Sequence, residues 1–186
     1  MGLHYLDLET TGFNPKEDKI ISMQIQPIFD NGKPRGRLEI YKSFGSAKNY
    51  GGIPETLYTE DDIVSMMWDK LMCGNIWDFI PVGFNLKFDF KFIGSRFEEK
   101  YPQFKWIDLF DRPYLDLHPL AVLINGGSFK HSGLDHVSEK KEDGAKVPEW
   151  YKKREYEKIE AYVKQETESF LKFYQKYFDL LAGARK

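Results

Sequence analysis

Three apolar segments at the start of the chain constrain its fold more than any other feature. Residues 3–8, 20–28 and 38–44 are rich in the aliphatic, β-branched and aromatic side chains that favour strands. The last two segments flank Asn31-Gly32, a dipeptide whose backbone preferences suit the tight turn of a β-hairpin. The sequence therefore predicts that the chain begins with a meander of three antiparallel strands.

Helices and short strands alternate along the rest of the chain. Apolar residues recur at helical spacing over residues 60–71, 87–97 and 155–181. Short apolar segments at residues 79–84 and 114–117 favour strands between these helices. A meander followed by alternating helices and strands predicts an α/β fold with a mixed central sheet.

Asp7 and Glu9 form the first candidate site. Alternation along a strand sends both side chains out of the same face, about 6.5 Å apart, where two carboxylates can hold a hard divalent cation. Thr10, Thr11 and Gly12 then end the strand in a small polar turn whose amides and hydroxyls could approach a nucleotide terminus closely. An Asp-x-Glu pair is common by chance, so an ordinary strand end without a ligand is the alternative.

Asp89 is the second candidate. It falls in the first turn of the helix predicted at residues 87–97, just beyond the strand at residues 79–84. A simpler explanation is available at this position, because an acidic residue there complements the helix dipole by about 0.3–1 kcal/mol. Asn85 is likewise a natural N-cap or turn residue. The pattern alone leaves a structural and a functional interpretation of Asp89 open.

Tyr162 and Glu166 provide the third candidate. They are four residues apart on the apolar stripe of the helix predicted at residues 155–181, so their side chains are neighbours on the helix surface. Glu166 interrupts this apolar face, and a charge placed there needs a partner or a metal ion. Alternatively, Glu166 reaches solvent at the edge of the stripe and pairs with Lys164 or Lys172.

These motifs carry a resemblance to a known family, in the order Asp7-Leu8-Glu9, residues 85–89 and residues 162–166. Together they resemble the DEDD superfamily of 3′→5′ exonucleases, in the tyrosine-bearing subclass that includes the proofreading domains of family B DNA polymerases. Residues 129–137 are also similar to the segment that precedes the third motif in such domains. The histidine-bearing subclass requires His-x4-Asp, a spacing that the chain lacks. One position departs from the family, because Glu166 stands where its members have Asp.

The resemblance implies a ribonuclease H-like fold, with three antiparallel strands first in a mixed central sheet and helices on both faces. It implies that four carboxylates hold two divalent ions, Mg²⁺ or Mn²⁺, while Tyr162 orients or helps to activate the attacking water. Two ions about 3.5–4 Å apart can stabilise both the attacking and the leaving oxygen of an in-line displacement. The implied metal ligands are Asp7, Glu9, Asp89 and Glu166, and the implied nucleic-acid contacts are Thr10, Thr11, Asn85 and Phe13, the last as an apolar wedge against the terminal bases.

The expected function is that of a metal-dependent 3′→5′ exonuclease that releases mononucleotides from single-stranded or frayed DNA ends. Its expected partners are single-stranded 3′ ends, with DNA favoured over RNA, and proteins of replication or repair. Two alternatives remain. A site that grips phosphates does not by itself read the 2′-hydroxyl, so an RNA-trimming exoribonuclease fits as well. The longer Glu166 side chain could instead mark a catalytically impaired module that only binds nucleic acid.

Composition narrows the class of protein further. The formal net charge of −2 argues against broad duplex binding, which needs a basic surface. The sequence has no apolar run of about 18 residues and no leader pattern, so neither a membrane span nor a secretion signal is expected. Its one cysteine excludes an intrachain disulfide and fits a reducing compartment such as the cytoplasm. With 186 residues and 41% hydrophobic content, a single domain over residues 1–186 is expected.

Two further features lie near the motifs in sequence. Asp116 and His118 follow the short strand at residues 114–117, where they either support the site or serve as polar strand-end residues. Residues 144–148, preceded by Lys140 and Lys141, are expected to form an exposed loop that touches the nucleic acid.

Overall fold

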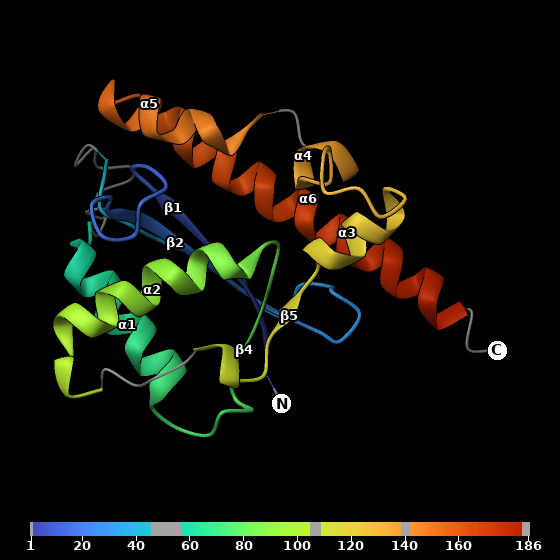
Figure 1. The fold of residues 1–186 in the computed structure, drawn as a ribbon, viewed down its shortest axis with the longest axis horizontal. Coiled ribbons are helices and arrows are strands. Elements are labelled where there is room, and N and C mark those ends of the chain that lie inside the picture. The colour runs from blue at the N-terminus through green and yellow to red at the C-terminus, as the bar shows by residue number, and fades with distance from the viewer. Residues whose placement is uncertain (1, 46–56, 105–108, 139–141, 184–186) are drawn as a thin grey trace.

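A mixed five-stranded sheet forms the centre of the computed structural model, which describes residues 2–45, 57–104, 109–138 and 142–183 (Figure 1). The strand order is β3-β2-β1-β4-β5. The first three strands are antiparallel neighbours, whereas β4 runs parallel to β1 and β5 runs parallel to β4. The strands are β1 Leu3–Thr10, β2 Ile20–Ile28, β3 Glu39–Lys42, β4 Ile80–Gly83 and β5 Leu115–Asp116.

The predicted meander is confirmed, and the hairpin signal marks the connection between β2 and β3. Gly32 adopts a positive φ of 77°, which Gly tolerates better than other residues. A Cβ atom at this position would also lie 2.4 Å from the ring of Tyr174. β3 is shorter than the predicted segment 38–44, because only Glu39–Lys42 pair with β2.

The three predicted long helices are present. α1 begins with a capping box, in which the Thr59 hydroxyl accepts a hydrogen bond from the backbone of Asp62 at 3.1 Å and the Asp62 carboxylate accepts one from the backbone of Thr59 at 2.8 Å. α3, α4 and α5 are shorter helices that the sequence pattern did not indicate. The helices are α1 Glu60–Met72, α2 Leu86–Lys100, α3 His118–Ile124, α4 Leu134–Val137, α5 Val147–Lys152 and α6 Tyr156–Gly183.

The prediction of an exposed loop at residues 144–148 is wrong in part. Gly144–Lys146 form a 3₁₀ turn, and Val147–Lys152 form α5. Val147 is buried against Ile159 and Tyr162 of α6, so the burial of this apolar side chain holds the segment against the long helix. Lys140 and Lys141 lie outside the described residues.

The two faces of the sheet are covered by different helices (Figure 1). On one face, Leu6 and Leu8 of β1 pack against apolar residues of α1 and α2. On the other face, Tyr5 packs in a cluster with residues of α3, α4 and α6, its ring centroid 4.6 Å from that of Phe170. Since side chains alternate along a strand, Asp7 and Glu9 share the face of Tyr5 and point toward α6.

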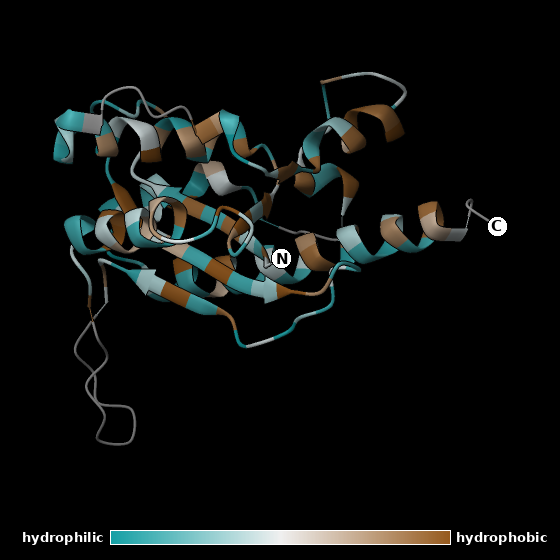
Figure 2. Cartoon of the chain, turned by 90° about the horizontal axis from the view of Figure 1, so that it is seen from below, coloured by the Kyte–Doolittle hydropathy of each residue, from teal (hydrophilic) through white to brown (hydrophobic). Residues whose placement is uncertain are grey.

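Bands of hydrophobic and hydrophilic residues alternate along the strands and helices (Figure 2). This pattern matches the two covered faces, because each element turns its apolar residues toward the sheet or the helices that cover it. Within the part of the chain that the structure describes, no helix has both the length and the apolar character needed to cross a membrane.

Candidate active site

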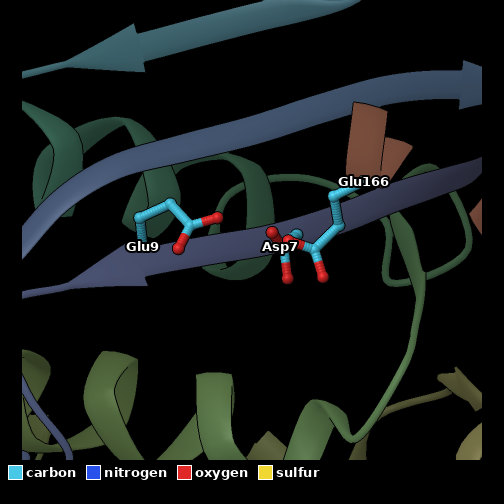
Figure 3. Close-up of side chains that lie close together, drawn as sticks. All are labelled: Asp7, Glu9 and Glu166. Carbon is cyan, nitrogen blue, oxygen red and sulfur yellow. The ribbon is translucent and has the colours of Figure 1, made fainter. Parts of the chain in front are cut away.

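Three carboxylates from distant parts of the sequence meet beside the sheet (Figure 3). Asp7 and Glu9 project from β1, and Glu166 projects toward them from α6. One oxygen from each side chain lies within 4.8 Å of the other two, and within the described residues this is the group suited to a metal ion. Oxygens bound to one Mg²⁺ at about 2.0–2.1 Å are at most about 4.2 Å apart, so small side-chain rotations would suffice to bind an ion.

The acid group, defined as Asp7, Glu9 and Glu166, opens into a cleft of about 270 Å³. Strand alternation places its first two members, and the packing of α6 on the same face of the sheet places the third. An all-carboxylate set of ligands suits Mg²⁺ or Mn²⁺ rather than zinc, which favours nitrogen and sulfur. Glu166 is partly buried and its carboxylate faces Asp7 and Glu9, which agrees with the prediction that it turns toward the interior.

Asp89 lies beside this group but is held separately. Its side chain is 3% exposed, and its Oδ1 accepts a hydrogen bond from the backbone nitrogen of Leu8 at 3.0 Å. β1 pairs with β4 from Leu3 to Tyr5, so Asp89 accepts a hydrogen bond from a backbone nitrogen of β1 that lies beyond this pairing. Burial raises the pKa of Asp89 well above its ordinary value, and the negative charges of Glu166 and Asp116 raise it further.

The beginning of α2 is fixed from β5. Asn85 adopts the left-handed conformation with φ 61° and ψ 43°, and its backbone nitrogen donates to Asp116 Oδ1 at 2.8 Å. The same oxygen accepts from the backbone of His118 at 3.0 Å. Asn85 is the N-cap residue of α2, as one of its two predicted roles had it, although among the described residues its side chain makes no capping hydrogen bond. Asp116 instead supports the turn that places Asp89.

His118 points away from the acid group. Its Nε2 lies 3.0 Å from the hydroxyl of Ser132, and its ring contacts those of Phe84 and Phe129. These contacts belong to the packing of α3 on the sheet. The interpretation of His118 as a polar strand-end residue fits this placement better than a supporting role at the site.

Tyr162 borders the acid group from the same helix as Glu166. Its side chain is 4% exposed, and its hydroxyl shares a hydrogen bond with Glu166. Burial raises the pKa of Tyr162 far above its ordinary value, as do the charges of Glu166 and Glu9, so the phenol keeps its proton. The backbone of Gly144 approaches closely, since a Cβ atom there would lie 2.6 Å from the Tyr162 hydroxyl.

The turn after β1 carries Phe13 at the edge of the cleft. Phe13 is 73% exposed, and its ring meets that of Phe88 edge-on with centroids 6.3 Å apart. Arg96 of α2 anchors this turn by donating a hydrogen bond to the Pro15 carbonyl at 2.9 Å. It also donates to Glu60 of α1 at 2.6 Å. An exposed aromatic ring on an anchored turn suits stacking against a base.

The other predicted nucleic-acid contacts fall in two groups. Thr10 and Asn85 line the cleft together with Phe13. Thr11 is instead part of the turn, because its hydroxyl donates to Asp18 at 3.2 Å and accepts from the backbone of Lys19 at 2.9 Å. The structure thus brings three of the four predicted contacts to the cleft and gives Thr11 a role in shaping the turn.

Two buried residues behind the site were missed by the sequence reasoning. Ser22 and Gln24 of β2 lie opposite Glu9 and Asp7 in the sheet register, and both are fully buried. A signal was present, because positions 22, 24 and 26 are all polar in a strand that is otherwise mostly apolar. Polar residues at every second position place amides and hydroxyls on one face of a strand.

Comparison with known proteins gives a result only at the level of structure. No protein-family model and no curated protein matches the sequence. A product-bound structure of exonuclease I aligns over 100% of this chain and 46% of its own length, with a TM-score of 0.57 and 13% identity. A structure described as SSB/exonuclease I in complex with the inhibitor CFAM aligns over 100% and 44%, with a TM-score of 0.56 and 12% identity.

The chain therefore spans less than half the length of these exonuclease I structures. Sequence identities this low establish a shared fold and nothing finer. The likeness confirms the predicted ribonuclease H-like α/β fold, with its mixed sheet and helices on both faces.

Proposed function

We propose that this chain is a metal-dependent 3′→5′ exonuclease that releases mononucleotides from single-stranded or frayed DNA ends. The convergence of Asp7, Glu9 and Glu166, with oxygens within 4.8 Å of one another in an open cleft, carries this proposal. The shared fold with exonuclease I supports it. Membership of the tyrosine-bearing DEDD subclass belongs to the same proposal, as does the direction of digestion.

Two divalent ions complete the proposed site. Asp7, Glu9, Asp89 and Glu166 would hold the two ions, and the first, second and fourth of these already lie together in the acid group. When bound, the ions would stabilise the attacking and leaving oxygens at the scissile phosphodiester, which gains negative charge in the transition state. The buried carboxyl of Asp89, whose pKa is raised beside other acids, fits a position at which a cation compensates the negative charge.

Tyr162 orients the attacking water in this proposal. A buried phenol whose pKa is raised keeps its proton at neutral pH, so it serves as a hydrogen-bond partner and not as a general base. Its bond to Glu166 fixes the direction of the hydroxyl. Gly144 leaves the hydroxyl just enough room, because a larger residue there would displace it.

The terminal nucleotide would be gripped at the edge of the cleft. Phe13 would stack against a terminal base, a contact worth about 1–3 kcal/mol for an aromatic side chain. Thr10 and Asn85 line the same cleft and offer polar groups to the sugar and phosphate. Single-stranded 3′ ends are the proposed partners, DNA ahead of RNA, and proteins of replication or repair are proposed to act with the enzyme.

The position of Glu166 favours the enzyme over the impaired binding module. The alternative required that the longer side chain remove one metal ligand, yet the Glu166 carboxylate lies with Asp7 and Glu9 (Figure 3). The exoribonuclease alternative differs only in the sugar that the cleft accepts. Comparing DNA and RNA substrates of one sequence, as described next, tests it.

The test is a time course on single-stranded DNA and RNA of one sequence, each labelled at the 5′ or the 3′ end. Reactions contain Mg²⁺, Mn²⁺ or chelator, and compare the unmodified chain with Asp7→Ala and Glu166→Gln. Glu168→Gln is the matched control, because Glu168 lies on the same helix and is exposed. Stepwise, metal-dependent shortening from the 3′ end that both site variants lose, and the control keeps, is expected. Binding without cleavage under every condition would contradict the proposal.

A further inference from the structure

A row of polar side chains is buried under the acid group. Ser22, Gln24 and Gln26 occupy alternate positions of β2, so they share the face that carries Asp7 and Glu9 on β1. Ser22 and Gln24 are 0% exposed and Gln26 is 4% exposed. A buried amide that lacks hydrogen bonds destabilises the fold, so the specific partners of each of these residues matter.

Gln24 directs its amide at Asp7. With the amide nitrogen facing β1, that nitrogen lies 2.6 Å from the Asp7 carbonyl oxygen and 3.2 Å from Asp7 Oδ2. In the same orientation, the Gln24 oxygen accepts a hydrogen bond from the Ser22 hydroxyl at 2.9 Å. The opposite orientation would set the amide oxygen against two acceptors, so the contacts themselves select the first one.

The two Asp7 oxygens therefore set the orientation of Gln24, Ser22 completes it by donating to the amide oxygen, and Gln24 holds one carboxylate oxygen of Asp7. We propose that Gln24 is a positioning residue, which fixes the rotamer of Asp7 so that its carboxylate meets Glu9 and Glu166 in a geometry ready for a divalent ion. The inference rests on the proposed function, since Asp7 is one of the proposed metal ligands.

The chemistry of an amide suits this task. Lys or Arg at position 24 would also hold Asp7, but its positive charge would oppose the binding of a cation at the same carboxylate. A neutral donor orients the ligand and leaves its negative charge available. Hydrogen bonds of this kind behind a metal ligand are typically worth about 10–100-fold in metal affinity or activity.

Gln26 provides a matched comparison within the same strand. It is also buried, but its amide nitrogen donates to the carbonyl oxygens of Gly36 at 2.5 Å and Pro27 at 3.3 Å. Those contacts join the end of β2 to the segment before β3 and involve none of the site carboxylates. Replacing Gln26 therefore removes a buried amide of the same size without releasing Asp7.

The experiment compares Gln24→Met, Ser22→Ala and Gln26→Met with the unmodified chain. Mn²⁺ affinity is measured by electron paramagnetic resonance of the free ion, cleavage of single-stranded DNA is measured as a function of Mn²⁺ concentration, and thermal melting in chelator checks folding. Gln24→Met is expected to weaken Mn²⁺ binding by about 10–100-fold. Ser22→Ala is expected to shift it less in the same direction, and Gln26→Met to leave it unchanged.

Mn²⁺ affinity and DNA cleavage separate the two proposals. If the unmodified chain binds Mn²⁺ without cutting DNA, the proposed function fails. The role of Gln24 is then tested by comparing the Mn²⁺ affinities of the variants with that of the unmodified chain. Unchanged Mn²⁺ affinity in a folded Gln24→Met variant overturns the inference, as does an equal loss in Gln26→Met. If Gln24→Met does not fold, the Mn²⁺ affinity of Ser22→Ala tests the inference instead, and an unchanged affinity overturns it. Lack of Mn²⁺ binding by the unmodified chain overturns both proposals.

Discussion

At the residue scale, Asp89 shows how opposing effects set the charge of one buried carboxyl. The carboxyl is buried, accepts a hydrogen bond from the backbone of Leu8, and lies near the charges of Glu166 and Asp116. Burial and like charges both oppose its ionisation, while the hydrogen bond favours it. The raised pKa shows that burial outweighs the hydrogen bond.

This balance predicts the effect of Asp89→Asn. Because the pKa of Asp89 is higher in the folded chain than in the unfolded chain, its contribution to stability is complete below the unfolded value and is lost as pH rises through the folded value. Asn cannot ionise, yet it keeps an oxygen for the Leu8 amide. In chelator, the variant should therefore melt at a higher temperature than the unmodified chain at neutral pH, and the difference should shrink in acid. Its metal-dependent cleavage should be lost. A lower melting temperature at neutral pH would contradict this account.

The length of the Glu166 side chain leads to a second prediction at the residue scale. Glu166→Asp withdraws the carboxylate by about 1.5 Å, the length of one C–C bond, from a group whose oxygens now lie within 4.8 Å. Mn²⁺ affinity and the rate of DNA cleavage should both fall. Glu168→Asp on the exposed side of α6 should change neither. A gain of activity in Glu166→Asp would mean that the native side chain impairs the site, as the binding-module alternative holds.

At the scale of elements, the turn between β4 and α2 determines where the Asp89 carboxylate lies. Asn85 holds a left-handed conformation there, and Asp116 of β5 accepts the hydrogen bond of its backbone nitrogen. Asn is among the few residues other than Gly that enter this conformation readily. The turn thus depends on the backbone of residue 85, whereas any contact with DNA depends on its amide side chain.

Two substitutions at this turn separate those contributions. Asn85→Ala should destabilise the fold by about 1–2 kcal/mol, the cost of a left-handed conformation for a residue with a Cβ atom. Asn85→Gly should remain about as stable as the native chain, because Gly enters this region freely. Denaturant unfolding measures both. If the side chain contacts the substrate, Asn85→Gly should raise KM for single-stranded DNA with little change in kcat, and an unchanged KM would remove Asn85 from the binding surface.

At the scale of the whole molecule, metal binding should raise the free energy of unfolding and therefore the melting temperature. Three carboxylates held together repel one another, and an ion that binds only the folded chain stabilises it by about 2.7 kcal/mol at a concentration 100 times its Kd. For a chain of this size, that corresponds to a rise of about 5–11 °C in Tm. Thermal melts with and without Mn²⁺ measure the rise. Asp7→Asn should abolish it, and Glu168→Gln should keep it.

Much of this architecture could be predicted because it depends on local patterns. Apolar periodicity indicated the long helices and the strands, and Asn31-Gly32 indicated the turn of the meander. Alternation along β1 predicted that Asp7 and Glu9 share one face, and helical spacing along α6 predicted that Tyr162 and Glu166 are neighbours. Each of these features is determined by residues close in sequence or by one buried face.

The remaining features depend on contacts between distant segments. The bond between Asp89 and the backbone of Leu8 joins positions 81 residues apart, and no local pattern reports it. The packing of Val147 on α6 converted part of a predicted loop into α5. The orientation of Gln24 follows from the sheet register, which fixes its neighbour across β1 only after the strands have paired.

The hydrogen bond from Leu8 to Asp89 also provides a spectroscopic probe of the site. The amide proton of Leu8 contacts the carboxyl oxygen directly, so its NMR chemical shift should follow the charge state of Asp89 and any ion bound there. Titration with Mg²⁺, which is diamagnetic, should move this resonance in the native chain and leave it in place in Asp7→Asn. A single backbone signal would then report the loading of the acid group in solution, without substrate and without turnover.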